Sequence, residues 1–171
     1  KLEKVNIEKW PDQYIMPLAD TKKGEIFFER TKRTWDEVDI CSVNTSTLKV
    51  KEIIHEEDKP YRDPHARSVA ILNDGKDILF RSERTGWGHY YHYDGDGNLK
   101  NTITSGQWVS GQIAEIDTLA RTIYLYGYGK EKGINPYYFM LYKANIDKEG
   151  VTPLSTEDGQ HNARFLKSKK Y

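Results

Sequence analysis

The amino-acid sequence predicts an all-β fold, a partial β-propeller of about three four-stranded antiparallel blades plus one extra strand. Short runs rich in β-branched and aromatic residues recur along the chain, and Gly, Asp, Asn and Pro separate them. These runs fall into three successive groups of four, with a period of roughly 40 to 55 residues that is typical of propeller blades. Helical periodicity is nearly absent, because its longest candidate, 50–58, leads directly into Pro60.

Each group of four runs predicts one blade. The first blade has strands at 13–19, 25–32, 37–44 and 49–55, and the second has strands at 67–72, 77–83, 89–94 and 99–104. The third has strands at 110–117, 122–128, 137–146 and 151–155, and a last strand begins near Asn162. Turn formers or polar residues precede each second strand, in TKKGEIFF at 21–28, NDGKDILF at 73–80 and TLARTIYL at 118–125.

We therefore interpret 1–171 as a single incomplete propeller segment. Its blades are expected at about 10–58, 66–105 and 108–157, with the start of a next blade at 158–171. Complete propellers have about four to eight blades, so we expect the segment to belong to a longer polypeptide. Its end faces would then expose apolar surface, which predicts self-association or contact with the missing blades.

Charge and cysteine content exclude several kinds of partner. Lys and Arg number 26, as do Asp and Glu, so no net field favours nucleic acid, and none is expected as a partner. The only cysteine, Cys41, excludes an intramolecular disulfide and is predicted to be a small buried hydrophobe. The first residues, KLEKVNIEKW, are too charged for a signal peptide.

No metal site or cofactor is predicted. His89 and His92 lie three apart on a predicted strand, so they should point to opposite faces, with one buried and the other exposed. The segment DGDGN at 94–98 resembles the start of a calcium loop, but its glycine is misplaced and Ser105 stands where the bidentate Glu is needed. A hairpin turn explains this segment better.

Three sequence blocks resemble a known family. They are SERTGWGHYYHYDGDGNLKNTITSGQW at 82–108, NPYYFMLYKANID at 135–147 and TPLSTEDGQHNARF at 152–165. Together they are similar to the later blades of the N-terminal β-propeller of dipeptidyl peptidase IV, among the prolyl oligopeptidase family serine peptidases, particularly the bacterial members. The resemblance implies a propeller that caps an α/β-hydrolase domain, admits short peptides, and works in the periplasm or cell envelope.

The resemblance also indicates which residues carry function. No serine lies in a G-x-S-x-G nucleophile elbow, so no catalytic residue is expected in this chain. The loop YRDPHAR at 61–67 resembles one that contributes to the substrate cavity, which makes Arg62, His65 and Arg67 candidates for its lining. An ordinary solvated loop held by prolines is the competing interpretation.

A second group of residues, Glu83, Arg84, Trp87 and His89, is interpreted as structural. A carboxylate, a guanidinium and aromatic rings can cross-link the second and third strands of a blade. The tryptophans as a class are expected to fill the space between adjacent sheets.

Two functions fit these observations. The first is a non-catalytic propeller segment of a dipeptidyl peptidase IV like serine exopeptidase, which gates and selects peptide substrates and supports the missing hydrolase domain. The alternative is a free-standing β-propeller-like module that binds a peptide, glycan or partner protein.

Overall fold

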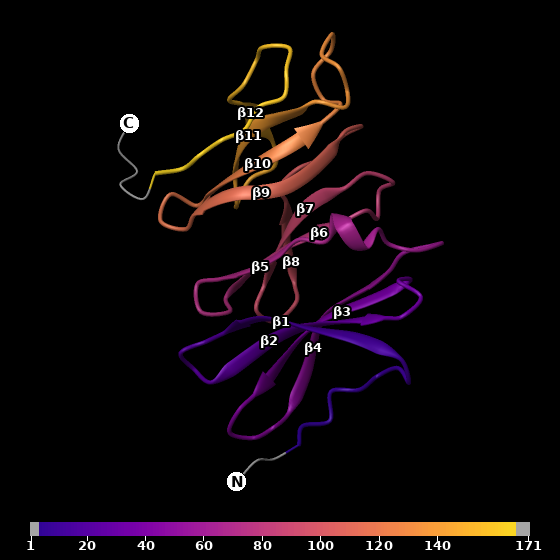
Figure 1. Cartoon of the computed structure of the whole chain (residues 1–171). Helices are drawn as coiled ribbons and strands as arrows, with labels where there is room; N and C mark the ends of the chain where they lie inside the picture. The colour runs from indigo at the N-terminus through magenta and orange to yellow at the C-terminus, as the bar shows by residue number, and fades with distance from the viewer. Residues whose placement is uncertain (1–3, 167–171) are drawn as a thin grey trace. The chain divides into compact units, whose positions relative to one another are not determined.

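The computed structural model describes residues 4–166, and its regular secondary structure there is almost entirely β-strand (Figure 1). The strands form three four-stranded sheets in which neighbouring strands follow one another in the sequence. Within the described residues the only helical element is a short 3-10 helix, Pro64–Ala66. No helix in this part of the chain is long and apolar enough to cross a membrane. Three successive four-stranded meanders are the blades of a partial β-propeller, as the sequence predicts.

The first sheet has one face that combines apolar and charged side chains. It consists of β1 (Gln13–Asp20), β2 (Glu25–Lys32), β3 (Glu37–Asn44) and β4 (Val50–Glu57). Phe28 pairs with Cys41 and Arg30 pairs with Asp39, so these four side chains lie on the same face. We call it the Arg30 face.

The second sheet consists of β5 (Val69–Leu72), β6 (Asp77–Ser82), β7 (His89–Asp94) and β8 (Leu99–Thr102). A tight turn joins its last two strands. Asp94 Oδ1 accepts hydrogen bonds from the backbone N–H groups of Asp96 and Asn98, each over 2.9 Å. Gly97 has a φ of 91°, which a residue with a side chain rarely adopts. The predicted hairpin turn is confirmed.

The third sheet separates apolar side chains from tyrosines. It consists of β9 (Val109–Asp117), β10 (Thr122–Tyr128), β11 (Phe139–Asn145) and β12 (Val151–Pro153). Residues alternate along β10, so Ile123, Leu125 and Gly127 point to one face and the tyrosines at 124, 126 and 128 to the other. The first of these faces is buried.

The contacts divide the described residues into two compact units. One comprises 4–79 with 93–99, and the other comprises 80–92 with 100–166. The core of the first unit includes the fully buried side chains of Phe27 and Ile40, and that of the second includes Leu125 and Tyr142.

The strands follow the sequence prediction closely. The predicted strands 25–32, 37–44, 89–94 and 122–128 coincide with β2, β3, β7 and β10, and the other ends differ by at most two residues. The strand predicted near Asn162 is not formed in 158–166, and the rest of that prediction lies outside the described residues. In this stretch the backbone N–H of His161 donates to Phe139 O over 3.2 Å, but 158–166 does not form the series of backbone hydrogen bonds that defines a paired strand.

The prediction that one of His89 and His92 is exposed is wrong. Their exposed fractions are 1% and 3%. Each imidazole has its own partner: His89 Nε2 lies 2.9 Å from Gly106 O, and His92 Nδ1 lies 3.1 Å from Asn101 Oδ1. Side-chain alternation along a strand does not by itself expose a face, because neighbouring segments can cover both sides.

Candidate functional site

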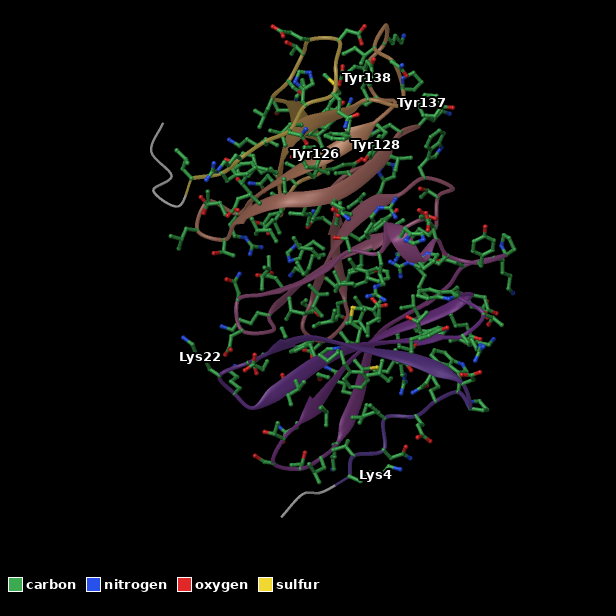
Figure 2. The ribbon with its side chains drawn as sticks, in the orientation of Figure 1. Lys4, Lys22, Tyr126, Tyr128, Tyr137 and Tyr138 are labelled. Carbon is green, nitrogen blue, oxygen red and sulfur yellow. The ribbon has the colours of Figure 1, made fainter. Side chains whose placement is uncertain are left out.

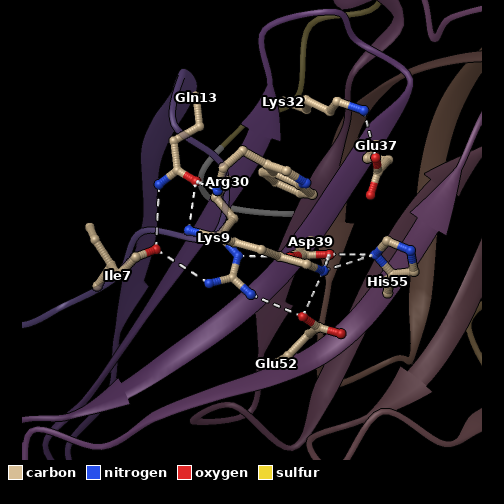
Figure 3. Close-up of polar contacts among 10 residues, drawn as sticks. Ile7, Lys9, Gln13, Arg30, Lys32, Glu37, Asp39, Glu52 and His55 are labelled. Atoms are coloured by element: carbon tan, nitrogen blue, oxygen red, sulfur yellow. Dashed lines mark hydrogen bonds and ion pairs between the residues drawn. The ribbon is translucent and has the colours of Figure 1, made fainter.

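The Arg30 face carries a network of charged side chains around one buried carboxylate (Figure 3). Arg30 Nε donates to Asp39 Oδ2 over 2.7 Å, and Arg30 Nη2 donates to Glu52 Oε2 over 2.9 Å. Lys9 Nζ donates to the two Asp39 oxygens over 3.1 and 3.0 Å. His55 Nδ1 lies 2.6 Å from Asp39 Oδ1. We call these five residues the Asp39 network.

The segment of residues 4–10 crosses the Arg30 face and covers its apolar part. Val5 and Ile7 pack on a buried cluster of Phe28, Cys41 and Val43. The Ile7 carbonyl also accepts hydrogen bonds from Arg30 Nη1 and Gln13 Nε2, over 3.3 and 3.4 Å. The charge of this segment hides its role in the sequence, although the alternation of Val5 and Ile7 with polar residues is a signal for an extended segment with one covered side.

Burial and hydrogen bonding act in opposite directions on Asp39. Burial alone would raise its pKa, but hydrogen bonds from His55, Arg30 and Lys9 outweigh this effect and hold the pKa of Asp39 below its ordinary value. The carboxylate is therefore ionised at neutral pH. Cys41, on the same face, is fully buried as predicted, and burial raises the pKa of its thiol to about 12.

Three members of the network could in principle ligate a metal ion. One ligand atom from each of Asp39, Glu52 and His55 lies within 4.8 Å of the others. However, Lys9 and Arg30 already form ion pairs with both carboxylates, so their charge is balanced without a metal. The arrangement is suited to holding segments together rather than to chemistry.

The predicted cavity loop, 61–67, is anchored to the first sheet. The backbone N–H of Arg62 donates to a carbonyl in the turn between β2 and β3 over 2.7 Å, and the residue is only 3% exposed. Arg67 Nη1 lies 3.2 Å from Oε1 of the buried Glu29. His65 is exposed on the 3-10 helix. Of the three candidates, His65 presents the most accessible side chain, and a cavity-lining role for any of them stays a prediction.

Two members of the predicted structural group lie just after β6 and have separate partners. Glu83 Oε1 forms an ion pair with Arg81 Nη1 over 3.0 Å. The Arg84 guanidinium lies 4.3 Å from the ring centre of Tyr91 on β7, and its Nε donates to Ser82 Oγ over 2.8 Å. Arg84 therefore links the segment after β6 to the third strand of its blade.

The other two members, Trp87 and His89, differ in their surroundings. Trp87 is 40% exposed among the described residues, and the expectation that it fills space between sheets stays a prediction. It lies in the exposed loop before β7. His89 is buried, and its imidazole lies 3.1 Å from Thr104 Oγ1. Burial lowers the pKa of His89, although a hydrogen bond with the Gly106 carbonyl opposes the shift.

Aromatic side chains cover one face of the third sheet (Figure 2). The Phe139 ring centroid lies 4.9 Å from that of Tyr126 and 6.0 Å from that of Tyr128. The segment after β12 crosses this face, because the Ala163 N–H donates to the Tyr126 hydroxyl over 3.0 Å and the Phe165 ring centroid lies 5.0 Å from that of Tyr124. The tyrosines of this face therefore contact other segments of the chain.

Comparison with known proteins identifies the chain's relatives. The family model of the dipeptidyl peptidase IV (DPP IV) N-terminal region matches residues 2–171. The chain belongs to that family. The resemblance drawn from the sequence blocks is therefore confirmed.

Solved structures agree on the fold of this DPP IV N-terminal region. Porphyromonas gingivalis dipeptidyl peptidase 4 matches 96% of the chain at 22% identity, with a TM-score of 0.79. A candidate dipeptidyl aminopeptidase IV from Bacteroides ovatus matches 86% at 14% identity, with a TM-score of 0.68. TolB from Acinetobacter baumannii matches 84% at 19% identity and covers 33% of that protein, with a TM-score of 0.57. The chain spans only 23% of each of the two peptidase chains.

Proposed function

We propose that the chain is a non-catalytic propeller segment of a dipeptidyl peptidase IV like serine exopeptidase of the periplasm or cell envelope. In that setting it supports an α/β-hydrolase domain and helps to gate and select short peptide substrates. The observation that carries the proposal is the match to the DPP IV N-terminal region over residues 2–171. The absence of a G-x-S-x-G serine from this sequence is consistent with a supporting role.

Two tryptophans occupy matching places in the first and third blades. In the third blade, Trp108 packs against Tyr142, with ring centroids 5.4 Å apart, and lies beside Gly127. In the first blade, the Arg30 guanidinium lies 5.9 Å from the Trp10 ring centre. Arg30 and Gly127 occupy the same position after the aligned segments 21–28 and 118–125. Trp10 therefore takes the place in the first blade that Trp108 takes in the third.

Part of the Arg30 face lies beyond the cover provided by residues 4–10. Ile15 pairs with Arg30 and Ile26 pairs with Val43, so both isoleucines lie on this face, and they are 38% and 40% exposed. A further blade of the same polypeptide would cover them, as apolar surface of this kind favours association. Without that blade, the same two side chains would favour self-association of the chain.

The test begins with the gene. We expect the reading frame to encode a hydrolase segment with a G-x-S-x-G serine on the same polypeptide. In that full-length enzyme, His65→Ala and Arg67→Ala should raise the KM for a dipeptidyl chromogenic substrate, whereas Lys100→Ala, an exposed residue of β8, should not. Melting temperatures of the variants separate a substrate effect from misfolding.

Two outcomes would overturn the proposal. One is a polypeptide without a hydrolase segment, which would favour the free-standing binding module. The other is turnover of the chromogenic substrate by the 171-residue chain that a substitution within it abolishes.

A further inference from the structure

A cavity of about 470 Å³ lies beside the indole of Trp108. The residues that line it come from three segments, namely the connection from β8 to β9, the loop after β10, and the turn into β12. They are Thr104, Ser105, Trp108, Lys130, Glu149, Gly150 and Val151. All of them belong to the unit of residues 80–92 and 100–166. The cavity lies outside the Asp39 network and the 61–67 loop.

Hydrogen bonds and ring packing hold the walls of this cavity. Trp108 Nε1 donates to Ser105 O over 2.6 Å, which fixes the indole within its own connection. The Gly150 N–H donates to Ile103 O over 2.9 Å, which ties the turn into β12 to the same connection. The Trp108 ring also packs on Tyr142 from β11. The cavity is therefore largely pre-formed, as small-molecule sites usually are.

Two opposite charges line the cavity on separate segments. The Lys130 ammonium lies 5.8 Å from the ring centre of Trp108, and the Glu149 carboxylate accepts a hydrogen bond from the Ser105 hydroxyl. Among the described residues neither charge has an ion-pair partner, in contrast to Lys9 and Arg30 in the first blade. A ligand of a single charge would attract one of these groups and repel the other. A ligand that carries both charges satisfies both groups.

We propose that this cavity binds a small zwitterion of the amino acid or dipeptide class. The ligand's carboxylate would pair with Lys130, its ammonium group with Glu149, and its side chain would pack on Trp108. The cavity volume lies within the range of about 300–1,000 Å³ that is usual for small ligands. Lys130 and Glu149 are exposed, so their ion pairs with the ligand would be weak. We therefore expect a dissociation constant on the order of 1 mM.

The test is a titration of the chain with the dipeptide Gly-Phe, followed by the NMR signal of the Trp108 indole N–H. Trp108→Phe assigns that signal. We expect saturable shifts for Gly-Phe, and about tenfold weaker binding after Lys130→Met or Glu149→Gln, as expected for the loss of one charge contact. Lys132→Met is the matched control, because Lys132 lies in the same loop but outside the cavity lining. The Lys132→Met variant should bind Gly-Phe with the same affinity as the unsubstituted chain.

Peptides with one blocked end test the zwitterion directly. N-acetyl-Gly-Phe lacks the ammonium group and Gly-Phe-amide lacks the carboxylate, so each should bind as weakly as Gly-Phe binds to the corresponding variant. Equal binding of the blocked and free dipeptides would overturn the proposal, as would the absence of a saturable shift. None of these outcomes depends on whether the chain belongs to a peptidase, because the measurement uses the chain alone.

Discussion

The Arg30 guanidinium donates a 2.7 Å hydrogen bond to the Asp39 carboxylate on neighbouring strands of the first sheet, where Asp39 has no exposed surface. A buried carboxylate is costly unless charged donors replace the water it loses. Lys9 and His55 provide the remaining contacts to Asp39. The Arg30 face can therefore contain the ionised Asp39 carboxylate while its apolar part, around Phe28, packs under residues 4–10.

Removing the Asp39 charge should destabilise the chain strongly. Asp39→Asn leaves Arg30 buried beside a neutral amide, and breaking a buried ion pair in this way costs about 3–5 kcal/mol. The free energy of unfolding, from urea titration followed by circular dichroism, measures the loss. Asp12→Asn is the matched control, because its ion pair with Arg33 is exposed and should matter much less. Equal losses for the two variants would contradict the assigned role of the Asp39 network.

The strands could be predicted because their signals are local. In β2, β3 and β10, β-branched and aromatic residues alternate between turn formers, and neighbouring strands in each sheet are consecutive in the sequence. The pairing of these strands could therefore be predicted without knowledge of contacts between distant parts of the sequence. The end of β8 and the start of β11 were harder, because polar and aromatic residues continue past the last paired residue.

The place of Lys9 in the Asp39 network could not be predicted, because its contacts are distant in the sequence. Lys9 and Asp39 are 30 residues apart, and Lys9 and Glu52 are 43 apart. Nothing in the charged segment 4–10 indicates which carboxylate its lysine meets. Aromatic character likewise predicts burial only where another segment covers the ring, and within the described residues Trp87 stays exposed.

Filling the space above Gly127 should disturb the packing of the third blade. A Cβ at this position would lie 2.6 Å from the Trp108 ring and 2.8 Å from the Tyr142 ring. Gly127→Ala should therefore cost about 1–3 kcal/mol of unfolding free energy, as overpacking of a core does. Gly159→Ala is the control, because an added Cβ there meets no atom within 4 Å. An unchanged urea midpoint for Gly127→Ala would show that Trp108 can move aside freely.

His89 should make stability depend on pH. Its pKa in the folded chain is lowered by burial, so the unfolded chain, with a pKa near 6.5, binds the proton more readily. The stabilising contribution is complete above about pH 6.5 and is lost as the pH falls toward the folded pKa. We expect the unfolding free energy to fall as the pH drops below about 6.5, and to fall less in His89→Gln.

The exposed His65 provides the control for this pH dependence. His65→Gln should keep the full pH dependence of the unsubstituted chain, because that imidazole lies at the surface. If His65→Gln and His89→Gln flattened the pH dependence equally, burial of His89 would not be its cause.

Cys41 should report whether residues 4–10 cover the Arg30 face in solution. Its thiol is fully buried and burial raises its pKa to about 12, so the folded chain should react very slowly with a thiol reagent such as DTNB. Ile7 packs on the cluster that contains Cys41, and Ile7→Ser should speed labelling by exposing the thiol more often. Asn6→Ser, at an exposed neighbouring position, should leave the rate unchanged. Rapid labelling of the unsubstituted chain would mean that the segment leaves the face open, and the Lys9 contact with Asp39 would then be transient as well.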